Sequence, residues 1–86
     1  MTIDGELTYA NANARWHVLA REALSAAEIN CAGITKIDSA GLALLTALRS
    51  YSDRGHSGGA DVRRLIHATP EIKRLAAAYD VAALFE

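Results

Sequence analysis

The stretch Ile37–Leu48 constrains the fold of this chain more than any other. It begins with an apolar residue, changes to two polar residues at Asp38 and Ser39, and continues with alanine, glycine and leucine. Asp and Ser are favoured helix N-caps because their side-chain oxygens accept from backbone N–H groups that have no helical partner. We therefore expect a strand to end at Ile37 and a helix to begin at Asp38 or Ser39 and to end near Arg54.

Apolar residues recur on this helix at spacings of three and four, as on a helix that packs against a sheet. The members of this stripe are Ala40, Gly41, Leu44, Leu45, Leu48 and Tyr51. Leu42 lies almost opposite, and we expect it to be exposed. The helix would then present free N–H groups, the Ser39 hydroxyl and an outward leucine at one end, which suits a docking partner or a phosphate group.

The residues before this stretch predict a strand, a helix and a second strand. Met1–Leu7 alternates weakly, and the range 11–24 carries apolar residues at helical spacing. The range 28–32 is almost continuously apolar, which indicates a strand buried on both faces. Gly33 marks a bend or a bulge before the chain reaches Ile37.

The second half of the chain continues the alternation of strand and helix. The range 55–59 is a glycine-rich loop, and Val62–His67 is a third strand. Thr69, Pro70 and Glu71 form a strong helix start, and we expect the last helix to turn Ile72, Leu75, Ala76 and Tyr79 inward. A short strand or turn follows in the range 80–86. The order predicts one α/β domain over residues 1–86, with a mainly parallel sheet flanked by helices.

Charge and hydropathy exclude several classes of partner. The chain has 86 residues and a formal net charge of −1, and its nine Lys and Arg residues are spread along it. A nucleic-acid binder would carry a basic patch, so we expect none. We expect the doublets Arg63–Arg64 and Lys73–Arg74 to lie on the solvent-exposed surface. No apolar run reaches the roughly 20 residues of a membrane span, and we expect a cytoplasmic protein.

The residues that usually carry chemistry form no recognisable constellation. Cys31 is the only cysteine, so we expect a buried, inert thiol in a reducing compartment. The three histidines share no metal-ligand spacing, and no phosphate-binding loop or dinucleotide fingerprint is present. We expect no cofactor, no metal and no enzymatic activity. Trp16 keeps two interpretations, as a core anchor of the first helix or as an exposed binding hot spot.

Three segments together resemble the STAS domains, named for sulfate transporters and anti-sigma-factor antagonists. They are Gly5-Glu6-Leu7, the range 29–34 (Ile-Asn-Cys-Ala-Gly-Ile) and the range 37–42 (Ile-Asp-Ser-Ala-Gly-Leu). The resemblance covers nearly the whole chain, although the family's usual first strand is short or absent. It implies a small α/β unit that binds partners and does not catalyse a reaction.

Within this family, the chain most resembles the STAS subunit of the phospholipid-transporting ABC system that maintains lipid asymmetry in Gram-negative outer membranes. The similarity lies in the run Gly41–Leu45, in the hydroxyl and small residues before it, and in the tryptophan of the first helix. It implies binding to the cytoplasmic ATPase subunit and only indirect contact with a membrane. The implied partner-binding residues are Trp16, Asp38, Ser39, Ala40, Gly41 and Leu42.

The alternative is an anti-sigma-factor antagonist that is phosphorylated by a serine kinase. The family's phosphoacceptor position falls on Ala40, and its acidic residue after the Gly-Glu-Leu segment falls on Thr8. Both departures weaken this alternative and leave Ser39 as the candidate phosphoacceptor, although a capping role suits Ser39 better. A small-molecule or nucleotide sensor is a third hypothesis, and the unpaired edge of the first strand suggests a possible homodimer.

Overall fold

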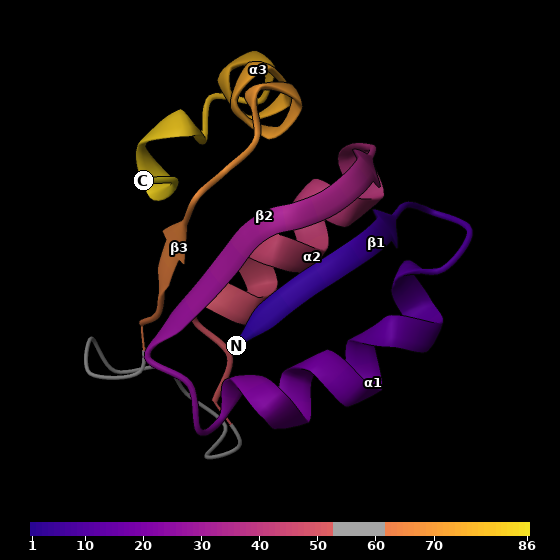
Figure 1. Ribbon diagram of the computed structural model, residues 1–86, viewed down its shortest axis with the longest axis vertical. Helices are drawn as coiled ribbons and strands as arrows, with labels where there is room; N and C mark the ends of the chain where they lie inside the picture. Colours follow the sequence, from indigo (N-terminus) through magenta and orange to yellow (C-terminus); the bar gives the residue numbers. More distant parts are fainter. Residues whose placement is uncertain (53–61) are drawn as a thin grey trace.

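The computed structural model describes residues 1–52 and 62–86, so the predicted loop 55–59 lies outside the described residues (Figure 1). The elements are β1 (Thr2–Leu7), α1 (Ala12–Ala23), β2 (Glu28–Ile37), α2 (Ser39–Arg49), β3 (Arg64–Ile66), α3 (Pro70–Ala78) and a 3-10 turn, η2 (Ala82–Leu84). The strands pair in the order β1-β2-β3, and both pairs are parallel. The predicted α/β fold with a parallel sheet is confirmed, but α2 ends at Arg49 and does not continue to Arg54.

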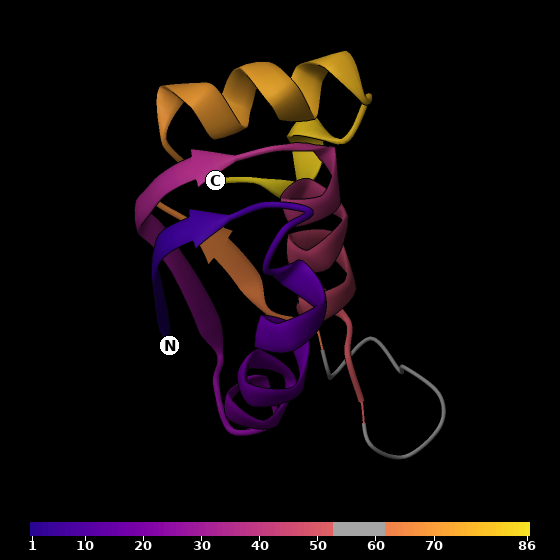
Figure 2. The same cartoon turned by 90° about the vertical axis from the view of Figure 1, so that its right-hand side faces the viewer.

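Helices α1 and α2 both lie on one face of the sheet, and the opposite face of β1 and β2 carries no helix (Figure 2). Ala32 and Lys36 of β2 are exposed there. The prediction that the second strand is buried on both faces is therefore wrong. A continuous apolar run shows that a strand can be buried, but the positions of the crossover helices decide which of its faces are covered.

Irregular pairing keeps the apolar residues of β2 on the covered face. Thr2 pairs with Asn30, Asp4 with Gly33 and Glu6 with Lys36. Between successive pairs β2 therefore advances three residues while β1 advances two. A residue added at a bulge shifts the alternation of side chains by one position. The buried residues of β2 are consequently Ile29, Cys31, Ile34 and Ile37. The bulge predicted at Gly33 is confirmed.

The core lies between the sheet and the helices. Its largest fully buried side chains are Ile3, Leu7, Ile29, Cys31, Leu45, Leu48, Leu65 and Ile72. Arg63 is also buried, and its guanidinium donates to the backbone carbonyls of Ala23, Leu48 and Tyr51. The prediction that Arg63 is exposed to solvent is wrong. Its guanidinium instead donates to backbone carbonyls near the ends of α1 and α2. Arg64 is exposed, as predicted, and pairs with Glu28 and Glu86.

Helix α3 begins as its sequence predicts. The Thr69 side chain accepts from the Ile72 backbone N–H at 3.2 Å, and Pro70 occupies the first turn. Glu71 accepts from the Ile37 backbone N–H at 3.2 Å and so fastens α3 to the end of β2. The chain then returns to the sheet, because Phe85 bridges to Leu65, which agrees with the predicted strand or turn.

The end of α3 turns sharply at Asp80, which has a φ of 60°. The Val81 N–H donates to the Ala76 carbonyl and the Asp80 N–H to the Ala77 carbonyl. These two bonds define a Schellman motif with an aspartate in the left-handed position usually occupied by glycine. Tyr79 is 56% exposed beside this turn, so the prediction that it points inward is wrong.

Candidate docking surface on helix α2

Asp38 caps α2 and links it to the loop after β1. Its Oδ1 accepts from the Ala40 and Gly41 backbone N–H groups at 3.0 and 3.1 Å, and its Oδ2 accepts from the Tyr9 N–H at 2.9 Å. These bonds, that of Tyr9 foremost, hold the pKa of the Asp38 carboxyl below its usual value. The predicted cap is confirmed. The expected free N–H groups are wrong for Ala40 and Gly41, because a carboxylate already occupies them.

Gly41 is buried where α2 crosses the end of β1. A Cβ on this residue would lie 1.9 Å from the Leu7 carbonyl oxygen and 2.9 Å from Ile37 Cγ1. The absent side chain therefore lets α2 approach the sheet closely. Gly41 supports the surface from beneath and offers no atoms to a partner.

Leu42 is buried, with an exposed fraction of 4%, so the prediction of an outward leucine is wrong. It points away from the stripe that faces the sheet, but Tyr79 and Val81, from the end of α3, line a depression together with it. A helical-wheel argument places Leu42 correctly and cannot foresee the segment that covers it. Leu42 offers a partner little surface of its own.

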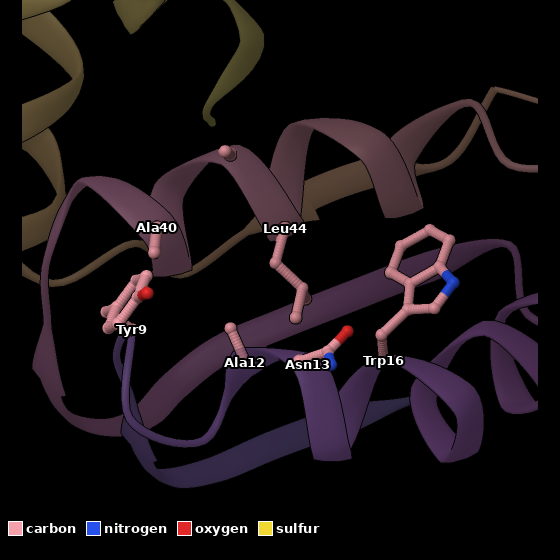
Figure 3. Close-up of a pocket in the computed structure, with 7 residues that line it drawn as sticks. Tyr9, Ala12, Asn13, Trp16, Ala40 and Leu44 are labelled. Carbon is pink, nitrogen blue, oxygen red and sulfur yellow. The ribbon is translucent and has the colours of Figure 1, made fainter.

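A groove runs between α1 and α2, with Tyr9 and Trp16 at its two ends (Figure 3). Ala12 and Asn13 line it from α1, and Ala40, Ala43 and Leu44 line it from α2. Its volume is about 370 Å³. Small side chains on α2 leave this groove open, and the aromatic rings bound it.

Trp16 is half-buried, and both sequence interpretations describe part of its surface. Its ring meets Tyr51 edge to face, with centroids 5.3 Å apart and planes at 84°, and it packs against the core cluster. The same ring forms one end of the groove shown in Figure 3. Aromatic side chains with one anchored and one accessible side are frequent hot spots of protein interfaces.

A second depression lies on the other side of α2, with a volume of about 300 Å³. Ser39, Leu42, Ala43, Thr46, Tyr79 and Val81 line it. Ala43 is exposed and belongs to both depressions, so it forms the ridge between them. We call the two depressions and this ridge the α2 surface. Of the predicted partner-binding residues, Trp16, Ser39, Ala40 and Leu42 line this surface. Asp38 caps α2, and Gly41 lets this helix pack closely against β1.

Among the residues that line this surface, Tyr9, Ala43 and Tyr79 are three that were not predicted as partner-binding residues. Tyr9 is 84% exposed in the loop after β1, and an aromatic residue two positions after a predicted strand was a usable signal. Ala43 carries no signal of its own, because small residues are common on both buried and exposed helix faces. Tyr79 joins the surface only through the turn at Asp80.

The described part of the chain offers no arrangement for metal binding. Across residues 1–52 and 62–86, no three His, Cys, Asp or Glu side chains lie close enough to hold an ion. Burial raises the pKa of the Cys31 thiol to about 11, which suppresses the reactive thiolate. No helix within the described ranges has the length and apolarity needed to cross a membrane.

Comparison with known proteins adds no relative. No protein-family model, curated protein or solved structure matches the chain.

Proposed function

We propose that this protein is a noncatalytic STAS-type docking subunit that binds the cytoplasmic ATPase of a phospholipid-transporting ABC system. The family part of this proposal is supported by the three segments that resemble STAS domains and by their place in the fold. Gly5-Glu6-Leu7 ends β1, the range 29–34 lies in β2, and the range 37–42 joins β2 to α2.

The observation that carries the docking role is the uncharged, accessible side of α2. Arg49 is the only charged residue of this helix, although Ser39, Ala43 and Ala47 are exposed to solvent. Solvent-facing helix positions usually carry charged or polar side chains. Small uncharged residues between two apolar depressions instead let a partner backbone approach closely. Tyr9 and Trp16 would supply the aromatic anchors.

The exposed Ser39 favours the alternative, an anti-sigma-factor antagonist phosphorylated at this serine. Ser39 is the first residue of α2, and its hydroxyl makes no hydrogen bond with any other described residue. A phosphate there would carry about two negative charges beside the Asp38 carboxylate, which already fills the positive end of the helix. This repulsion, together with alanine at position 40, places the ATPase-binding role first.

The test is affinity capture from an extract of the source organism, with bound proteins identified by mass spectrometry. Ala43→Arg places a long cation on the ridge of the α2 surface without removing a buried group. Ala78→Arg makes the same change at an exposed position of α3 and serves as the matched control. Circular dichroism of both variants establishes that they are folded.

An ABC ATPase retained by the wild type and by Ala78→Arg, but lost from Ala43→Arg, is the expected result. Retention of the ATPase by all three proteins would contradict the proposed surface. Nucleotide-dependent capture of a serine kinase, with phosphate appearing on Ser39, would replace the transporter role by the antagonist role.

A further inference from the structure

The outer edge of β1 has unused backbone hydrogen-bonding groups. β1 lies at the end of the strand order, and β2 pairs with only one of its edges. The Met1 amino group donates to the Glu28 carbonyl, and the Met1 carbonyl accepts from the Asn30 N–H. Successive residues of an extended strand direct their backbone groups to alternate sides. The N–H and C=O groups of Thr2 and Asp4 therefore face the outer edge, where no other described strand lies.

The remainder of this edge is closed. The Glu6 carbonyl accepts from Asn11 Nδ2 at 2.9 Å and from Arg15 Nη1 at 2.6 Å. Gly5 has a φ of 78°, which interrupts the extended backbone. Covered carbonyls and a local kink are common ways to block an edge strand. Only the first half of β1 remains available for pairing.

A slot of about 340 Å³ runs along this open half, between β1 and α1. Thr2 and Asp4 line it from the strand, and Ala14, Arg15, Val18, Leu19 and Glu22 line it from the helix. Val18 is 60% exposed and gives the slot an apolar wall.

Acidic side chains outnumber basic ones in the slot, which is lined by the carboxylates of Asp4 and Glu22 and the guanidinium of Arg15. The Asp4 and Glu22 carboxylates form no ion pair or hydrogen bond within residues 1–52 and 62–86. Arg15 is half-buried, and its guanidinium is engaged by the Glu6 carbonyl. A cationic side chain in the slot would therefore meet two carboxylates that no described residue pairs with, against one guanidinium that already donates to a backbone carbonyl.

We propose that this slot binds a short extended segment of a partner protein, which adds to β1 as a further strand and carries Lys or Arg beside an apolar residue. The backbone groups of Thr2 and Asp4 require an extended occupant, because a helix has no free groups along its length. The acidic lining selects a basic segment. A second copy of β1 would bring its own Asp4 and Glu6 against these carboxylates, which disfavours pairing between copies.

The experiment is an amide NMR titration of the intact protein with blocked synthetic peptides. The first peptide alternates lysine and valine, the second alternates glutamate and valine, and the third repeats the first with every backbone amide N-methylated. Asp4→Asn and Glu22→Gln each remove one charge from the slot. Asp80→Asn removes one charge at the turn after α3 and is the matched control, because asparagine tolerates the left-handed conformation there.

We expect only the first peptide to shift the amide signals of Thr2, Asp4 and Val18. Asp4→Asn and Glu22→Gln should each weaken this binding by about 1.4- to fivefold, the range measured for exposed ion pairs, and Asp80→Asn should leave it unchanged. Equal binding of the N-methylated peptide would overturn the proposal, because it would show charge attraction without strand pairing. Concentration-dependent shifts without peptide would also overturn it, by assigning the edge to a second copy. The slot is separate from the α2 surface, so neither result bears on the proposed ATPase binding.

Discussion

Replacement of Gly41 by alanine separates helix propensity from tertiary packing, because the two effects should change the free energy of unfolding in opposite directions. Alanine is favoured over glycine inside a helix by about 1 kcal/mol. In the structure, however, the new Cβ would lie 1.9 Å from the Leu7 carbonyl oxygen, where an ordinary contact is 3.4–4 Å. The obstructing atom belongs to the backbone of β1, which β2 holds in place. Overpacking costs about 1–3 kcal/mol, and a backbone obstruction belongs at the upper end. The net expectation is a loss of about 2 kcal/mol in the free energy of unfolding, after about 1 kcal/mol of propensity is regained.

Urea denaturation followed by fluorescence of Trp16 measures this loss, because Trp16 is the only tryptophan and packs against Tyr51. The melting temperature should fall by about 8–16 °C for a domain of this size. Ala43→Gly, at an exposed position of the same helix, is the control and should cost about 1 kcal/mol through propensity alone. A Gly41→Ala protein as stable as the wild type, or more stable, would refute the close approach of α2 to β1.

Further expectations concern a buried cation, a cap, a strained turn and a thiol. Arg63→Met removes three hydrogen bonds and leaves the Tyr51 carbonyl without a donor, whereas the Ala23 and Leu48 carbonyls still accept from backbone N–H groups. At about 1–3 kcal/mol for an unsatisfied buried group, thermal melts should show a loss of about that size. The pKa of Asp38 is lowered in the folded state, so its contribution to stability is present above the ordinary value of 3.8 and lost as pH falls through the lower folded pKa. Urea melts over this pH range should therefore show wild type losing stability relative to Asp38→Asn, and parallel curves would contradict the cap. Asp80→Gly relieves a positive φ and should raise the free energy of unfolding by about 0.5–1 kcal/mol, whereas Asp80→Val should lower it. Cys31, with its pKa raised to about 11 by burial, should react with a thiol reagent at pH 8 only as fast as the protein unfolds, and rapid labelling would contradict its burial.

The candidate site was predictable where it depends on neighbouring residues. Asp38 caps the two N–H groups that follow it by two and three positions, and this geometry is implicit in any Asp-Ser helix start. Its third bond, to the Tyr9 N–H, spans 29 residues and has no local signature. Leu42 illustrates the same limit, because its direction away from the sheet follows from helical spacing, while Tyr79 and Val81, which line a depression with it, come from the end of α3.

Local sequence was sufficient to predict the alternation of strands and helices, the caps at Asp38 and Thr69, and the bulge at Gly33. Each of these is decided by residues within a few positions, through hydrogen bonds and side-chain spacing that the order of residues already contains. The tertiary structure alone decided that one face of β2 remains open, that Arg63 is buried, and that an apolar surface forms on α2 between α1 and the end of α3. Those outcomes require segments far apart in the chain to meet, since burial is a property of the partner that covers a residue as much as of the residue itself.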